Sequence, residues 1–279
     1  MIVDAHCHIL PPSFAHRRRE LATRDATFAA ILADPSARIA GASSLLGAMT
    51  RDGVDHAVVM GMGWTDLQVA VEANDHIIES VAAHPSRLTG FASVNPAWGD
   101  AAVGEVERCA AAGLRGIGEL HPDTQGIDIA DEAVMAPLMD LARSLGLPVL
   151  LHCSEPVGHD YPGKGKTTPD KVWRLIENFP DNIIVCAHWG GGLPFYALMP
   201  EVGAALGNVY FDSAASPFLY RPGIYPAAVG LVGAERILFA SDYPLMPPSR
   251  PLGEVANEPL PEGHRRSILG GNAARLLGL

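Results

Sequence analysis

The feature that most constrains the fold of this chain is a repeated alternation of short apolar runs with longer amphipathic stretches. Such alternation is typical of parallel β-strands joined by crossover helices. The apolar runs lie at Ile2–His8, Ala57–Gly61, Leu88–Val94, Leu114–Leu120, Pro148–His152, Ile183–His188, Val209–Asp212 and Ile237–Ser241. Eight βα units without a linker-like segment predict an α/β fold of one closed (β/α)₈ TIM barrel, in which residues 1–279 form a single domain.

The segments between the runs predict the crossover helices and two longer loops. Helical periodicity is clearest at Leu67–Ala83, Ala101–Ala112, Asp131–Leu145 and Pro169–Phe179. Longer insertions follow the first predicted strand, at residues 9–51, and the fifth, at residues 154–168. Both insertions follow strand C-termini, where barrel enzymes carry their functional loops.

Composition narrows the class of protein. A hydrophobic content of 48% with 18% charged residues allows a sizeable core, and the net charge of −11 argues against nucleic-acid or anionic-membrane partners. The start of the chain lacks signal-peptide features, and no apolar run is long enough to span a membrane. The cysteines show no C-x-x-C pair, so we expect reduced thiols and a cytoplasmic protein.

Polar residues capable of binding metal recur at the ends of the predicted strands. His6 and His8 are two residues apart on one strand, so both imidazoles point to the same face. Four further residues lie at or near other strand ends: Glu119, His152, His188 and Asp242. Buried polar groups at these positions lower stability unless they are ligated or paired. The set predicts a divalent-metal site at the C-terminal ends of the strands, with zinc as the expected ion.

The same alternation of side chains predicts where the cysteines lie. Cys7 and Cys153 each neighbour a predicted ligand by one residue, so we expect them in the layer between the sheet and the helices. Cys186 has the same parity as His188, so we expect it inside the barrel.

The residues near the predicted strand ends also suggest substrate contacts. Tryptophans there predict an apolar wall to the pocket, and the loop after the fifth strand predicts a lid whose lysine meets a substrate carboxylate. A solvated loop is the alternative interpretation of that segment. The expected substrate-binding residues are Trp64, His121, His159, Tyr161, Lys164 and Trp189.

Five short motifs resemble the amidohydrolase superfamily: DAHCH at 4–8, LH at 151–152, AHWGG at 187–191, ASDYP at 240–244 and GNAARLL at 271–277. They are most similar to its amidohydrolase-related branch, which includes aminocarboxymuconate-semialdehyde decarboxylase. The resemblance implies that His6, His8, His152 and Asp242 bind one metal, with His188 beside it for proton transfer or substrate orientation. In the last motif, Asn272 is placed to cap the final helix.

The number of metal ions stays open at Glu119. Many two-metal amidohydrolases have a carboxylated lysine at the end of the fourth strand, whereas this strand end carries Glu119 and no lysine. Glu119 bridges two metals in one interpretation, as a glutamate does in the TatD-like branch, and His152 and His188 then hold the second ion. In the other interpretation it is a carboxylate beside a single metal or a substrate hydrogen-bonding group.

The resemblance predicts a metal-dependent hydrolase that acts on a small amide, ester or lactone. The metal would lower the pKa of a bound water, Asp242 would accept its proton, and His188 would polarise the substrate or protonate the leaving group. One alternative is nonoxidative decarboxylation or hydration of a small carboxylic acid at the same site, and another is a catalytically inactive metal-binding barrel. We expect a small-molecule substrate that bears a carboxylate as partner, no nucleic acid or membrane, and leave a homodimer open.

Overall fold

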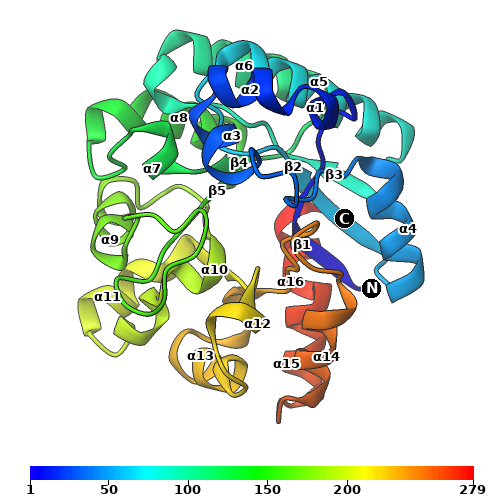
Figure 1. Ribbon diagram of the computed structural model, residues 1–279. Helices are drawn as coiled ribbons and strands as arrows, with labels where there is room; N and C mark the ends of the chain where they lie inside the picture. Colours follow the sequence, from blue (N-terminus) through cyan, green and yellow to red (C-terminus); the bar gives the residue numbers. More distant parts are fainter.

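The computed structural model describes residues 1–279 and contains eight parallel strands in a ring (Figure 1). Each strand overlaps one of the predicted apolar runs. The strands are β1 (Val3–His8), β2 (His56–Met60), β3 (Leu88–Gly90), β4 (Ile117–Leu120), β5 (Val149–Leu151), β6 (Ile184–Cys186), β7 (Val209–Asp212) and β8 (Ile237–Leu238). The predicted barrel is confirmed.

Two ladders and two single bridges close the ring. One ladder runs β1-β2-β3 and the other runs β4-β5-β6-β7-β8. Ala92, just after β3, bridges to Ile117 of β4, and Cys7 of β1 bridges to Tyr243, which follows β8. All pairs are parallel, and both faces of the sheet are covered. Burial on both faces explains why the strands read as apolar runs.

Helices cover the outside of the ring, and shorter ones lie in the connections. Eight helices pack apolar side chains against the outside of the strands: α4 (Ala42–Asp52), α5 (Leu67–Ala83), α6 (Asp100–Ala111), α8 (Glu132–Leu145), α9 (Pro169–Asn178), α11 (Pro200–Ala205), α13 (Ile224–Val232) and α14 (Ser249–Asn257). The others are α1 (Ser13–His16), α2 (Arg18–Arg24), α3 (Ala26–Ile31), α7 (Pro122–Gln125), α10 (Ala187–Gly190), α12 (Ser216–Leu219), α15 (Glu262–Arg266) and α16 (Asn272–Leu277). The bounds predicted for α5, α6, α8 and α9 hold to within one residue.

The last helix seals the interior of the barrel. Ala273 and Leu277 of α16 pack with inward-facing strand residues such as Val58 and Leu150. The Asn272 side chain donates hydrogen bonds to the carbonyl oxygens of Ala234 and Ile237. It makes no capping bond, so the predicted cap is wrong: its amide instead ties the start of α16 to β8.

The cysteines are buried and lie outside the barrel interior. Cys7 and Cys153 belong to the layer between the strands and the helices, as predicted. Cys186 lies in the same layer, so its predicted place inside the barrel is wrong. Alternation fails there because the backbone leaves the extended conformation after β6, where His188 has φ 55°.

Irregular pairing in β1 and β4 changes which residues face inward. In β1, Asp4 and Cys7 pair with residues only two apart on β2, and the shift lies between them. In β4, Ile117 and Leu120 likewise pair with Val149 and Leu151. Such bulges re-aim side chains and are common beside active sites. Because Ile117 and Leu120 both pack in the outer layer, the bulge sends Glu119 into the barrel.

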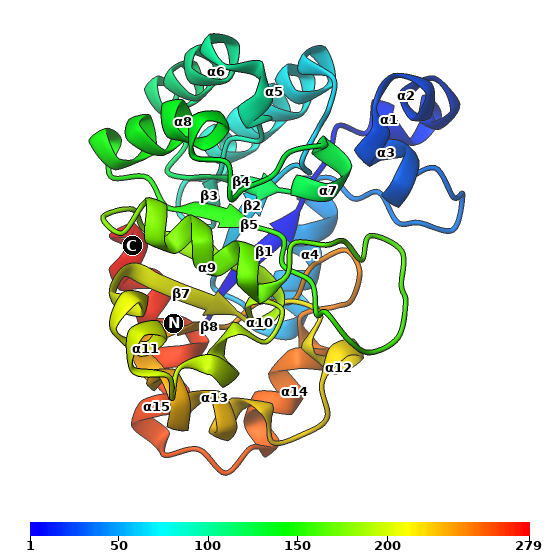
Figure 2. The same cartoon turned by 90° about the vertical axis from the view of Figure 1, so that its left-hand side faces the viewer.

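The two insertions lie at one end of the barrel, away from the chain termini (Figure 2). Helices α1, α2 and α3 lie in the first insertion, which is shorter than predicted because its last part, from Ala42, belongs to the barrel helix α4. Residues 154–168 form the long loop after β5. The insertions therefore border the C-terminal ends of the strands. None of the helices is both long and apolar enough to cross a bilayer.

Candidate metal centre

Four side chains from three strand ends converge inside the barrel. His6 Nε2 and His8 Nε2 of β1 are 3.1 Å apart. Glu119 Oε2 of β4 lies 3.7 Å from His6 Nε2 and 3.5 Å from His8 Nε2. Asp242 Oδ1, after β8, lies 3.4 Å from His8 Nε2 and 4.0 Å from His6 Nε2. The sequence prediction that these residues meet on one rim agrees with the geometry.

Hydrogen bonds at the far side of both rings fix which nitrogen carries the proton. His8 Nδ1 donates to the carbonyl oxygen of Gly61 at 2.8 Å, and His6 Nδ1 donates to Asp212 Oδ2 at 2.9 Å. A neutral imidazole carries one proton, so the two Nε2 atoms that face each other are both lone-pair acceptors. Two acceptors at 3.1 Å need a positive charge between them, which either a proton or a metal ion supplies.

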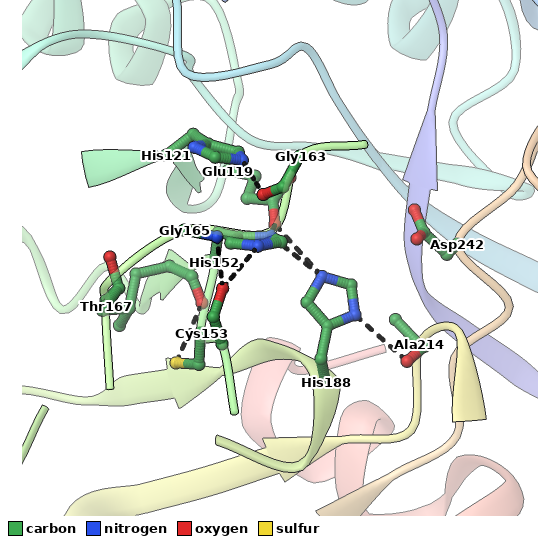
Figure 3. A network of polar contacts seen from close by, with 12 residues as sticks. Glu119, His121, His152, Cys153, Gly163, Gly165, Thr167, His188, Ala214 and Asp242 are labelled. Carbon is green, nitrogen blue, oxygen red and sulfur yellow. Dashed lines mark hydrogen bonds and ion pairs between the residues drawn. The ribbon is translucent and has the colours of Figure 1, made fainter. Parts of the chain in front are cut away.

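A second pair of imidazoles meets the other oxygen of Glu119. His152 Nδ1 of the β5 end lies 3.1 Å and His188 Nε2 lies 3.6 Å from Glu119 Oε1. The two nitrogens are 3.1 Å apart (Figure 3). His188 Nδ1 donates to the carbonyl oxygen of Ala214, so its Nε2 is also an acceptor. Glu119 therefore stands between two histidine pairs.

Two of these residues, His188 and Asp242, have left-handed backbone conformations that direct their side chains toward the cluster. His188 has φ 55° and Asp242 has φ 62°, values that non-glycine residues adopt rarely and at a cost of about 1–3 kcal/mol. The N–H of His188 donates to Asp212 Oδ1, and the N–H of Asp242 donates to the carbonyl oxygen of His6. These bonds hold the strained residues in place.

The pKa values show that the cluster stabilises positive charge. Burial opposes ionisation, but Asp212 and Glu119 hold the pKa of His6 well above its ordinary value. Burial raises the pKa of Glu119, yet the neighbouring histidines bring it well below its usual range. Against burial, His8 and the other histidines lower the pKa of Asp242 to about 2. Carboxylates and imidazoles together thus form a buried cluster that favours positive charge on its histidines.

Asp212, at the end of β7, is a site residue that the sequence analysis missed. It is fully buried, and it accepts hydrogen bonds from His6 Nδ1 at 2.9 Å and from the N–H groups of His188 at 2.9 Å and Ala214 at 3.0 Å. One carboxylate thereby orients a histidine of each pair. A signal was present: Asp212 closes an apolar run as His152 and His188 do.

We expect Asp212→Asn to lower metal affinity by about 10–100-fold, because carboxylates that orient ligand histidines have effects of this size. The asparagine keeps the shape of the side chain, but its amide cannot accept all three hydrogen bonds. Titration of the metal-free protein with Mn²⁺ measures the affinity. Asp140→Asn, on an exposed helix face, is the control. Unchanged affinity in Asp212→Asn would rule out the orienting role.

His121 is the predicted substrate residue closest to the cluster. Its ring stacks on His152 with centroids 4.2 Å apart, and its Nε2 donates to the carbonyl oxygen of Gly163 (Figure 3). Burial and the neighbouring His152 lower the pKa of His121 to about 4, so its ring is neutral near pH 7. Through its bond to Gly163, His121 holds the C-terminal part of the loop 154–168 beside His152 and His188.

The other predicted loop residues contact one another. Tyr161 donates to Glu155, and His159 lies 5.7 Å from the Tyr161 ring between centroids. Lys164 Nζ donates to the carbonyl oxygens of Val157 and His159. These bonds hold the loop in its own fold, and the substrate contacts predicted for it stay predictions.

The two predicted tryptophans are fully buried away from the cluster. Trp64 packs against Phe14 and Phe28 of the first insertion. Trp189 packs against Tyr225 and donates through Nε1 to Ser216. The structure thus places both side chains in packing layers and does not bring them to the candidate metal-binding residues.

Comparisons with known proteins identify relatives along the whole chain. The family model described as amidohydrolase matches residues 3–279. The 2-amino-3-carboxymuconate-6-semialdehyde decarboxylase of Dictyostelium discoideum is 26% identical, over 83% of this chain and 75% of its own length.

Solved structures share the fold. The 5-carboxyvanillate decarboxylase of Sphingomonas paucimobilis has a TM-score of 0.82 at 19% identity and covers 100% of this chain and 99% of its own. A dihydroxybenzoic acid decarboxylase of Polaromonas sp., solved with bound manganese and the inhibitor 2-nitroresorcinol, has a TM-score of 0.78 at 19% identity and covers 100% and 97%.

Proposed function

Because the chain belongs to the amidohydrolase family, whose members matched here include metal-dependent decarboxylases, we propose that it is a metal-dependent, nonoxidative decarboxylase of a small carboxylic acid. The observation that carries the proposal is the buried set of imidazoles and carboxylates at the strand ends. The sequence analysis placed hydrolysis first and decarboxylation second. The relatives favour the second of these.

The donor atoms fit a divalent ion. The facing Nε2 acceptors of His6 and His8, with Asp242 Oδ1 and Glu119 Oε2 beside them, would hold it. Imidazole and carboxylate donors suit zinc and manganese alike, so the sequence-based choice of zinc stays a prediction. When bound, the ion supplies Lewis acidity toward the oxygen atoms of the substrate.

Asp242 is the residue we assign to proton transfer. Its side chain is 15% exposed, whereas the imidazoles around it are less than 10% exposed, so it is the cluster member that solvent reaches most easily. Loss of CO₂ breaks the bond between the substrate carbon and its carboxylate, and that carbon must then gain a proton. Asp242 is ionised near neutral pH, so its Oδ2 would take up a proton from solvent and pass it to this carbon.

Hydrolysis is a second candidate, and one observation favours it. Glu119 faces a histidine pair with each of its oxygens, and paired metal sites of this kind serve hydrolysis in phosphatases and aminopeptidases. Decarboxylation and hydrolysis would use the same donor atoms. They differ in product, so a direct assay separates them.

The test is a screen of Mn²⁺- and Zn²⁺-loaded protein against hydroxybenzoates, carboxymuconate-type acids, lactones and esters. Release of ¹³CO₂ from a carboxyl-labelled acid, abolished by a chelator and restored by metal, is the expected result. Hydrolysis of a lactone or ester without CO₂ release would replace the proposal with the second candidate. Failure of the protein to bind any divalent ion would overturn both.

A further inference from the structure

We infer that Trp189 is a positioning residue for His188, and the inference rests on the proposed function because it requires His188 to act in the reaction. Trp189 has φ 58° and ψ 26°, so it follows His188 in the left-handed region of the backbone. The next three residues, 190–192, are also left-handed, and all three are glycines. This region favours glycine because glycine has no Cβ. A tryptophan at the second of five such positions points to a function of its side chain.

The side chain of Trp189 lies in a different layer from the imidazole of His188. It is fully buried outside the strands, where its ring packs edge-on against Tyr225 with centroids 5.0 Å apart. The His188 imidazole instead meets His152 and Glu119 inside the barrel. Two adjacent residues thus attach one turn to both layers of the fold.

The segment after β7 binds this pair of residues at three alternate positions. The N–H of His188 donates to Asp212 Oδ1 at 2.9 Å, and His188 Nδ1 donates to the carbonyl oxygen of Ala214 at 3.1 Å (Figure 3). Trp189 Nε1 donates to Ser216 Oγ at 3.1 Å. The first two bonds hold the backbone and the ring of His188, and the third holds the residue that follows it.

The glycines after Trp189 cannot fix the turn by themselves. A Cβ at Gly190 would lie 2.9 Å from the Phe211 ring, and a Cβ at Gly191 would lie 2.4 Å from the carbonyl oxygen of Ser154. Side chains do not fit at these positions, and glycine restricts the backbone least of all residues. Trp189 therefore carries the last side chain before the glycines that can fasten the turn, and its bond to the segment after β7 is the anchor.

Loss of this anchor lets the turn relax and shifts His188 Nε2 from its partners inside the barrel. Trp189→Phe keeps a ring against Tyr225 but removes the N–H, and Ser216→Ala removes its acceptor. We expect each variant to lower kcat by about tenfold at saturating metal, because residues that orient an active-site histidine have effects of about 10–100-fold. KM should change less than about threefold, since substrate binding is not altered directly. Trp173→Phe, in the outer layer on α9, is the control.

A double variant tests whether Trp189 and Ser216 act through one hydrogen bond. Both single substitutions break the same bond, so Trp189→Phe combined with Ser216→Ala should be no slower than the slower single variant. Independent effects would instead multiply to about 100-fold. Thermal unfolding of every variant shows whether a loss of kcat reflects a loss of fold.

The proton on His188 Nδ1 gives a readout that does not depend on turnover. In protein labelled with ¹⁵N-histidine, with and without Zn²⁺, this buried N–H should give a slowly exchanging resonance. Its absence in His188→Gln identifies it among the signals of the 11 histidines. We expect the resonance to broaden or exchange faster in Trp189→Phe and Ser216→Ala, and to be unchanged in Trp173→Phe.

Each result points one way. A lower kcat with a broadened His188 resonance in both single variants supports the positioning role. An unchanged resonance in both overturns it, and a fall in thermal stability alone would leave Trp189 as a core residue. Additive losses in the double variant overturn the shared bond. If the wild type decarboxylates no acid, the proposed function fails, and the resonance alone decides whether Trp189 positions His188.

Discussion

Replacement of both His6 and His8 by alanine is expected to abolish metal binding beside Asp242 and to lower turnover by roughly 10³-fold or more. The two Nε2 atoms lie 3.1 Å apart and are the imidazole donors of the group formed by His6, His8 and Glu119. Lewis-acid stabilisation by a metal is worth several kcal/mol. Each 1.4 kcal/mol of activation free energy changes the rate about tenfold, so the loss of several kcal/mol lowers turnover by roughly 10³-fold.

The matched control is Cys7→Ala, which alters the residue between the two histidines. Cys7 packs in the outer layer, so its replacement should leave the metal content unchanged. Metal analysis and steady-state kinetics at excess Mn²⁺ compare the variants. If the double variant kept its full complement of metal, the facing imidazoles would not be the site.

Asp242→Asn is expected to lower kcat by about 10²–10⁴-fold, the usual contribution of a positioned general acid. Asparagine preserves the shape of the side chain and one oxygen near His8, but its amide nitrogen cannot shuttle a proton to carbon. Asp242 also faces His8, so its replacement can weaken metal binding. The kcat is therefore measured at saturating metal, where a lower metal affinity does not change the rate.

A pH profile and deuterium incorporation separate proton transfer from a purely structural role. In D₂O, the wild type should place deuterium on the carbon that loses CO₂. A proton donor must be protonated to act, so the fall of kcat with rising pH that belongs to Asp242 should disappear in Asp242→Asn. A variant with normal kcat at saturating metal would show that another group delivers the proton, and His188 would be the next to test.

The candidate site lies in a protein of acidic overall charge. A net charge of −11 repels an anionic substrate at long range, so local positive charge at the strand ends must attract it. We expect the dependence of KM on ionic strength to be shallow, since screening weakens both the surface repulsion and the local attraction.

Much of the molecule could be read from local pattern. The eight strands follow from the apolar runs, because a parallel strand buried on both faces has few polar residues. Four of the helices and the two insertions follow from the segments between those runs. Polar residues at strand ends then predicted a site, since the carboxyl ends of barrel strands meet at one rim. His6 and His8 were the clearest case.

Orientation inside that rim was decided only by the tertiary structure. Alternation cannot say which way Glu119 points, because Ile117 and Leu120 both face outward across a bulge. Gly118 permits this path: it has φ 146°, and a Cβ there would lie 2.7 Å from the carbonyl oxygen of Leu150. A bulge depends on the neighbouring strand, so no local sequence rule predicts it.

The left-handed turn at His188 explains the remaining differences. Alternation placed Cys186 inside the barrel with His188, but the backbone turns after β6 and separates them. Asp212, 24 residues later in the chain, accepts the N–H of His188 and also the Nδ1–H of His6. The sequence by itself determined the barrel and the residue types at its rim. The pairing of those residues into two sets depended on bonds between distant strands, because such contacts form only when the ring closes.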